Sequence, residues 1–236
     1  MPARAAGKEP LSRERLLDAA LAVADADGLG AVTMRNVAQV LECEAMTLYY
    51  YVDDKAALLA GLTEAVVDEI ARTALGVHLA ADAGDWREVV RRRCLDARRV
   101  MLRHPWAPAL VATQAQVPPT IVPLFEALVA TMVEAGCSYE LAHRAIHSLN
   151  SLMLGFTQEL FEPTADDEWT STAELEAMAT AAPHLARLAE VVAHEAEGSL
   201  SPCDTQAEFE FTLGLILDGL EGHRRAEATG GTEDTS

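Results

Sequence analysis

Residues 33–59, TMRNVAQVLECEAMTLYYYVDDKAALL, restrict the fold more than any other part of the chain, because they contain two short helical patterns with a tight connection between them. Thr33 has a side chain that caps helices well, and Ala38 is small where the second helix must approach. Three apolar side chains are spaced to pack against a preceding helix: Val37, Leu41 and Leu48. The segment is therefore predicted to be two short helices resting on a longer one, which Ser12 caps.

The second short helix, expected over residues 45–51, carries three consecutive tyrosines that cannot all be buried on one helical face. Each hydroxyl is able to reach a phosphate oxygen or a base edge of DNA. Lys55 opens the next helix, where its ammonium group and the first backbone amides suit a phosphate. The alternative is a helical hairpin with partly exposed tyrosines, since aromatic side chains usually belong to a core.

The rest of the chain also favours helices. Half of the 236 residues are hydrophobic, and Ala and Leu, which favour helices, are prominent among them. No long alternation of β-branched or aromatic residues indicates a sheet. The chain is predicted to be all-α, with a flexible tail (1–11), a three-helix domain (12–58), a larger helical body (59–225) and a disordered tail (226–236).

Charge argues against a protein that coats nucleic acid without specificity, because phosphate binding rests on Lys and Arg and the formal net charge is −19. The acidic excess is uneven. Residues 1–55 hold six basic and nine acidic side chains, a net of −3, so the remainder carries −16. The predicted three-helix domain, called the head below, is therefore less acidic than the body, although composition alone does not indicate DNA binding.

Residues 33–59 resemble the DNA-binding domain of the TetR family of bacterial repressors. The resemblance rests on Thr33 and Arg35, on Ala38, on the TLYYYV core and on Lys55 with the leucine pair that follows it. It implies a helix-turn-helix whose second and third helices contact an operator in the major groove. Carried over, the DNA-contacting positions are Thr33, Met34, Arg35, Ala45, Met46, Thr47, Tyr49, Tyr50 and Tyr51, with Lys55 on the backbone.

One position departs from the family pattern. The family usually has glycine after the leucine that ends the second helix, and this chain has Glu42. A residue other than glycine costs about 1 kcal/mol there if the backbone must be left-handed. Glu42 and Glu44 also place negative charge close to the expected DNA, which predicts modest and salt-sensitive affinity.

The body resembles the tetracycline-repressor branch of the same family, in the helix that ends at His104, in Gly136-Cys137-Ser138 and in GFTQELFE (155–162). The resemblance implies a C-terminal ligand-binding and dimerisation domain, with a homodimer formed through helices near 139–162 and 205–225. The last helix carries an apolar stripe made by Phe209, Leu213, Ile216, Leu217 and Leu220. Such a stripe also fits a core helix that packs inside one chain.

Proteins of this branch enclose a small molecule in the body, and pockets of this kind are mostly apolar with a few polar groups. Candidate ligand contacts with that mixture are Leu102, His104, Trp106, Leu110, Gln114, Phe125, His143, His147, Asn150 and Met153. Three positions that bind tetracycline or magnesium in the tetracycline-binding members of this branch correspond in this chain to Ala71, Arg93 and Val111. Alanine and valine cannot replace a histidine ligand, so a small, partly apolar inducer other than a magnesium–tetracycline chelate is expected.

Catalysis has no support in the sequence. His143 and His147 share a helix face, but Arg-Ala-Ile separates them and the glutamate of a zinc-protease motif is missing. Neither metal nor cofactor is expected. No run of residues is apolar and long enough to cross a membrane, and no secretory leader or CxxC pair is present, so a reduced, cytoplasmic protein is expected. The competing hypothesis is a helical small-molecule-binding protein or enzyme with a vestigial DNA-binding head.

Overall fold

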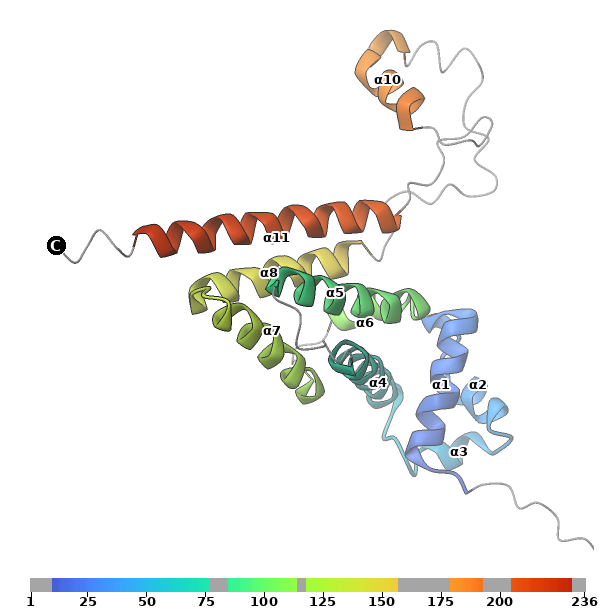
Figure 1. Cartoon of the computed structure of the whole chain (residues 1–236). Coiled ribbons are helices and arrows are strands. Elements are labelled where there is room, and N and C mark those ends of the chain that lie inside the picture. Colours follow the sequence, from blue (N-terminus) through green and yellow to red (C-terminus); the bar gives the residue numbers. More distant parts are fainter. Residues whose placement is uncertain (1–9, 77–84, 114–117, 157–178, 193–204, 231–236) are drawn as a thin grey trace, which may run out of the picture. The chain divides into compact units, whose positions relative to one another are not determined.

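The computed structural model describes residues 10–76, 85–113, 118–156, 179–192 and 205–230, and its regular elements in those ranges are all helices (Figure 1). The predicted all-α class is therefore confirmed. The chain forms two compact units, one made of residues 1–158 with 213–236 and the other of residues 159–212. Helix α10, Pro183–Val192, belongs to the second unit.

Three helices make the N-terminal head: α1 (Arg13–Asp27), α2 (Met34–Val40) and α3 (Ala45–Leu48). Both predicted caps are present. The Ser12 hydroxyl accepts a hydrogen bond from the backbone N–H of Arg15 at 3.2 Å, and the Thr33 hydroxyl accepts one from that of Asn36 at 3.1 Å. Gly28 ends α1 with a φ of 77°, and a 3-10 turn (Leu29–Ala31) leads into α2. Fully buried apolar side chains from all three helices form the core of the head: Leu16, Ala20, Val37 and Leu48.

Helix α4, Lys55–Gly76, connects the head to the body. Its 22 residues span about 33 Å at 1.5 Å per residue. Near its start Gly61 faces α1, where an added Cβ would lie 2.6 Å from Leu17 Cδ2. This close approach packs the head directly on α4, so a movement of α4 is transmitted to the head.

The body consists of α5 (Trp86–Arg103), α6 (Ala107–Ala112), α7 (Val122–Glu134), α8 (Tyr139–Gly155) and α11 (Thr205–Gly230), with a 3-10 turn at Pro119–Ile121. Helix α4 contacts α5, α6 and α7, and α8 packs on α5, α6 and α7. The predicted helix from 138 to 162 is observed as far as Gly155, and residues 157–162 lie outside the described residues.

Two boundaries differ from the sequence-based expectation. Helix α3 ends at Leu48 rather than 51, because the next three residues form a turn in which the N–H of Tyr51 bonds to the carbonyl of Leu48 at 2.9 Å. The C-terminal tail was expected to begin at residue 226, but residues 226–230 continue α11. Several of these residues favour helix, which explains the extension without any core contact.

The apolar stripe of α11 packs inside its own chain. Leu213 and Leu217 are fully buried and Leu220 is nearly so. The opposite side of the helix presents Leu215, with an exposed fraction of 59 %, together with Gly219 and Gly222. Leu213, Leu217 and Leu220 therefore pack as the core-helix alternative expects, and the expectation that the stripe itself forms the dimer contact is wrong for these three leucines.

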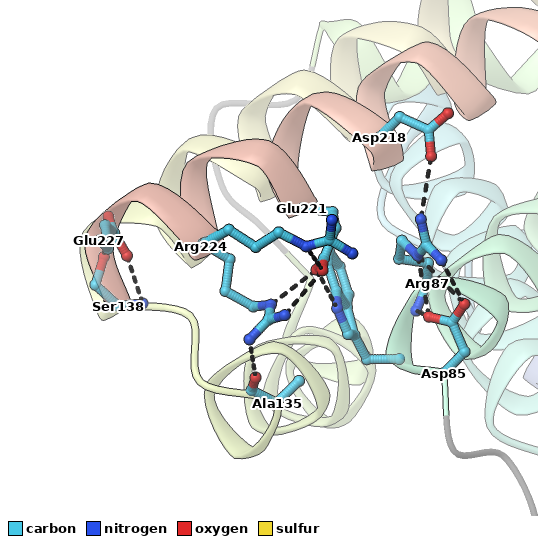
Figure 2. A network of polar contacts seen from close by, with 10 residues as sticks. Asp85, Arg87, Ala135, Ser138, Asp218, Glu221, Arg224 and Glu227 are labelled. Atoms are coloured by element: carbon cyan, nitrogen blue, oxygen red, sulfur yellow. Dashed lines mark hydrogen bonds and ion pairs between the residues drawn. The ribbon is translucent and has the colours of Figure 1, made fainter. Parts of the chain in front are cut away.

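A polar network holds α11 on the body, and Glu221 is its centre (Figure 2). Its carboxylate accepts hydrogen bonds from both Arg224 Nε and Nη2 at 2.8 Å, from Arg225 Nε at 2.7 Å and from the Trp86 indole at 3.2 Å. The hydrogen bonds from Arg224 are the largest cause that lowers the pKa of Glu221. Burial raises this pKa, but the hydrogen bonds from Arg225 and Trp86 lower it again, so the pKa lies far below its usual range. Glu221 is therefore an ionised link between α11 and the start of α5.

The same face of α11 is fixed at two further points. Asp218 accepts a hydrogen bond from Arg87 Nη1 at 3.2 Å, and Glu227 accepts one from the Ser138 hydroxyl at 2.9 Å (Figure 2). Ser138 also caps α8 by accepting from the N–H of Leu141. These contacts orient α11 relative to α5 and to the turn between α7 and α8.

Candidate nucleic-acid interface and ligand cavity

The connection between α2 and α3 is closed by a residue in the left-handed region. Glu42 has a φ of 52°, while the N–H of Cys43 bonds back to the carbonyl of Ala38 at 3.0 Å. This conformation suits glycine, and a residue with a Cβ is strained there. The departure noted in the sequence is therefore a non-glycine residue held in the conformation that glycine would adopt freely.

The outer side of α3 and the turn after it is exposed. Tyr50 has an exposed fraction of 86 %, Met46 of 76 % and Tyr49 of 45 %. Thr47, Arg35 and Lys55 are exposed as well, whereas Thr33, Met34 and Ala45 are half-buried at the starts of α2 and α3. Met46 and Thr47 of α3 and Tyr49 and Tyr50 of the following turn therefore expose one thioether, one aliphatic hydroxyl and two phenols, and Arg35 and Lys55 add two exposed cationic side chains.

Tyr51 differs from its two neighbours. Its hydroxyl donates a hydrogen bond to the backbone carbonyl of Leu11 at 2.8 Å, and its ring lies edge-on to that of Tyr50 with centroids 5.2 Å apart. The side chain is half-buried. Tyr51 thus ties the segment before α1 to the end of α3 and supports the exposed Tyr50 ring.

The head meets the body at the corner between α5 and α6. Here the buried His104 ring places Nδ1 2.7 Å from Asp25 Oδ1 on α1 and Nε2 3.2 Å from Glu69 Oε2 on α4. The indole of Trp106 also donates to Asp25, at 2.7 Å. Burial raises the pKa of Glu69, but hydrogen bonds from His104 and Arg103 lower it by more. His104 and Trp106, both predicted ligand contacts, thus make polar bonds between the head and the body.

A cavity of about 290 Å³ lies among α4, α5, α6, α7 and α8. Three of the predicted ligand contacts line it: Phe125, Asn150 and Met153. Of the positions compared with the tetracycline-binding relative, Arg93 and Val111 line it and Ala71 is buried outside it. Leu110 is buried in α6 away from the lining. Ligand contact by any of these residues stays a prediction.

The remaining candidates lie elsewhere. Leu102 is half exposed on the outside of α5, because it faces away from the helices that cover Met101. His143 and His147 are exposed on α8, with ring centroids 4.6 Å apart. Gln114 lies outside the described residues. In the described part of the chain no group of three or more His, Cys, Asp or Glu is placed to hold a metal ion.

Other lining residues were not identified from the sequence. Thr63, Val67 and Ile70 of α4 and Cys94, Ala97 and Met101 of α5 face the cavity. Their helical spacing marks an inward face in each helix, but the same spacing describes an ordinary core. The cavity depends on the packing of five helices, which the spacing within each helix does not reveal.

Cys94 and Arg93 are the titratable groups of the lining. Burial raises the pKa of the Cys94 thiol to about 12, so the thiol is neutral near pH 7. Burial lowers the pKa of Arg93 from its usual value, and an arginine still stays charged in proteins. The cavity therefore combines an apolar wall with one guanidinium cation.

The described helices thus build a three-helix head with an exposed helix-turn-helix, connected by α4 to a body that contains a cavity, which is the architecture of a DNA-binding regulator with its own ligand site. Two family models match the sequence, "Bacterial regulatory proteins, tetR family" over residues 16–62 and "Tetracyclin repressor-like, C-terminal domain" over residues 80–224. The chain belongs to the TetR family of transcriptional regulators, and the resemblance noted in its sequence is confirmed.

Relatives and solved structures agree with this assignment. The HTH-type transcriptional repressor DrrR1 of Streptomyces coeruleorubidus is 26% identical over 94% of this chain and 82% of its own length. A possible TetR family transcriptional regulator from Streptomyces coelicolor A3(2) is 32% identical, with a TM-score of 0.70 over 89% of this chain and 99% of that one. The TetR family protein ActR of Streptomyces coelicolor, solved in complex with actinorhodin, shares the fold at 24% identity and a TM-score of 0.67, over 92% of this chain and 99% of that one. Among the described helices none is both long and apolar enough to cross a membrane.

Proposed function

We propose that this protein is a repressor that binds a palindromic operator as a homodimer and leaves it when a small, partly apolar molecule occupies the cavity. One observation carries the proposal: α4 begins in the head at Lys55 and continues into the cavity wall at Thr63, Val67 and Ile70. A ligand that moves the cavity wall therefore moves the element on which the head is packed. Ligand and operator need to be coupled by about 1–3 kcal/mol for such a switch.

In this proposal, α3 and the turn after it contact the operator. Met46, Thr47, Tyr49 and Tyr50 supply apolar and hydroxyl groups toward base edges, and Lys55 contacts the backbone. Arg35, Thr33 and Met34 lie at the start of α2, and Ala45 begins α3. Tyr51 acts mainly through Tyr50, because its own hydroxyl is bonded to Leu11. A dimer sets two such heads about 34–36 Å apart, on successive turns of the major groove.

The homodimer is proposed to form through α8 and the exposed side of α11. Leu215 provides an exposed apolar contact, and Gly219 and Gly222 allow a partner helix to approach closely. The network around Glu221 holds α11 in place behind this surface. The domains proposed earlier, a head over 12–58 and a body over 59–225, fit this division of roles, and α11 extends the body to residue 230.

The names of similar proteins support the regulatory role. DrrR1 is named as a transcriptional repressor, and ActR was solved with a bound small molecule. Proteins of this kind act on chromosomal DNA, so we place this one in the cytoplasm. The matched proteins are named as regulators, which favours a regulator over an enzyme.

Binding to the DNA upstream of the protein's own gene tests the proposal. We expect Tyr50→Ala to weaken operator binding about two- to tenfold, because a lost hydrogen bond to a neutral base edge costs about 0.5–1.5 kcal/mol. Tyr139→Ala is the control, since Tyr139 is also largely exposed (75 %) but lies at the start of α8 instead of the head, and its dimer must be shown to be intact because α8 is part of the proposed dimer contact. Fluorescence anisotropy measures affinity, and light scattering checks the dimer of each variant. Unchanged binding by the Tyr50 variant would refute the operator-reading assignment.

The competing hypothesis, a ligand-binding protein with a vestigial head, has support from the strain and negative charge at Glu42. A salt titration separates the two. A working repressor prefers a selected palindrome and loses affinity steeply as salt rises, because cations are released from DNA on binding. A vestigial head shows no sequence preference at any salt concentration.

A further inference from the structure

The cavity has an uneven chemical character. Its lining is mostly aliphatic and aromatic, with Thr63 and Asn150 as neutral polar residues and Arg93 as the charged one. No acidic residue is among the lining residues, and the thiol of Cys94 is neutral near pH 7 because its pKa is raised to about 12. Arg93 therefore brings the single positive charge of the lining to the wall of this cavity.

Arg93 is attached to α7 only through neutral acceptors. Its Nη1 donates to the carbonyl of Ala127 at 2.7 Å and to the hydroxyl of Thr131 at 3.0 Å. The Nε atom is buried and has no hydrogen-bond partner among the described residues. Within the same part of the chain Arg93 forms no ion pair, whereas its neighbour Arg92 pairs with Glu88 at 2.7 Å. The guanidinium is thus held in place but is not neutralised.

Arg93 is half-buried, and a charge that is partly removed from water is disfavoured unless it is paired. Burial alone lowers the pKa of Arg93, and no neighbouring charge contributes to that shift. A cation held in this way would gain most from an anion brought into the cavity, since guanidinium and carboxylate groups form charge-assisted hydrogen bonds with matching geometry. The Nη1 bonds to α7 fix the group in advance, so that little side-chain freedom is lost when an anion binds.

We propose that the cavity binds a small apolar carboxylate, such as an aromatic acid, whose apolar body lies against Phe125 and Met153 and whose anionic group pairs with the guanidinium of Arg93. The inference rests on the proposed function, in which this cavity holds the inducer. It narrows the inducer from any partly apolar molecule to an apolar acid small enough for a cavity of about 290 Å³.

Matched acid and amide pairs test the charge requirement. The full-length protein is titrated by calorimetry with benzoate, 2-naphthoate and anthracene-2-carboxylate, and with the amide of each. We expect at least one acid to bind about tenfold or more tightly than its own amide, the size of one charge-assisted hydrogen bond. Equal affinity within every pair, or no binding by any of the acids, overturns the proposal.

Three variants assign the preference to Arg93. Arg93→Met should bring the acid and its amide to within about threefold of each other, and Arg93→Lys should keep part of the difference because it keeps the charge. Arg92→Met is the matched control, since Arg92 is exposed and faces Glu88 instead of the cavity. An Arg93→Met protein that folds and still prefers the acid contradicts the assignment. If this variant does not fold, the wild-type pairs and Arg93→Lys still decide the question.

Operator release, followed in the same samples by fluorescence anisotropy, separates this inference from the proposed function. If the acid binds through Arg93 and leaves operator affinity unchanged, the cavity assignment stands and the repressor mechanism fails. If neutral amides release the operator as well as the acids do, the mechanism stands and the anion requirement is wrong.

Discussion

Glu42 occupies the turn between α2 and α3 with a φ of 52°, and its replacement by glycine should stabilise the protein. A residue with a Cβ pays about 1–2 kcal/mol for left-handed backbone. Glycine avoids this cost but loses more conformational entropy on folding, by about 0.5–1 kcal/mol. The difference leaves a gain of about 0.5–1 kcal/mol, which corresponds to a rise in Tm of about 1–4 °C for a chain of this size.

Two variants with the same charge change separate the backbone effect from electrostatics. Glu42→Gln removes the charge but keeps the strained backbone, and Glu44→Gln removes a charge at a residue whose φ of −72° is ordinary. Thermal unfolding of all three variants is measured at one protein concentration, because the stability of a dimer depends on concentration. The strain argument is refuted if Glu42→Gly is no more stable than Glu42→Gln.

The same variants should bind DNA differently from the parent. Each of them removes one negative charge close to the expected phosphate backbone, so operator affinity should rise in all three and the rise should shrink at high salt. A gain confined to Glu42→Gly would point to the shape of the turn instead of its charge. Anisotropy titrations at 50 and 200 mM salt distinguish these results.

Two further perturbations act on contacts away from the cavity. Tyr51→Phe removes the hydrogen bond to Leu11 and should lower the free energy of unfolding by about 0.5–1.5 kcal/mol in urea titrations, while operator affinity changes less than twofold. Glu221→Gln removes a carboxylate whose pKa is held far below its ordinary value of 4.5, chiefly by hydrogen bonds from Arg224. The stabilisation from Glu221 is complete above pH 4.5 and is lost as the pH falls below it, so the wild type and variant should differ most near pH 7 and converge in acid. A difference independent of pH would show that Glu221 acts by packing alone.

Local features of the head could be predicted from the sequence because they depend on neighbouring residues. The caps at Ser12 and Thr33 and the unusual position of Glu42 need only a few residues of context. The role of Tyr51 could not be predicted in this way. Three successive residues on a turn point in three directions, and the acceptor for Tyr51 lies 40 residues away along the chain.

The body was harder to predict because its contacts are distant in sequence. His104 was expected to face a ligand, but the residues that it bonds to are Asp25 and Glu69, which are 79 and 35 positions away. The apolar stripe of α11 was recognised correctly as a buried surface. The apolar spacing predicts that Leu213 and Leu217 are buried, but it does not indicate whether they pack against their own chain or against a second copy of it.

The bonds at Asp25 restrict how the head is able to move. A rigid body held at one point keeps three rotational degrees of freedom, and a second fixed point leaves only rotation about the line that joins the two. The head is covalently joined to α4 before Lys55, and Asp25 fixes it a second time to His104 and Trp106. While those bonds last, the packing of α1 on α4 at Gly61 also opposes rotation about the line through these two points. If the Asp25 bonds break, the link to α4 and the packing at Gly61 still hold the head, and in the proposed dimer the spacing of the two heads would then follow α4.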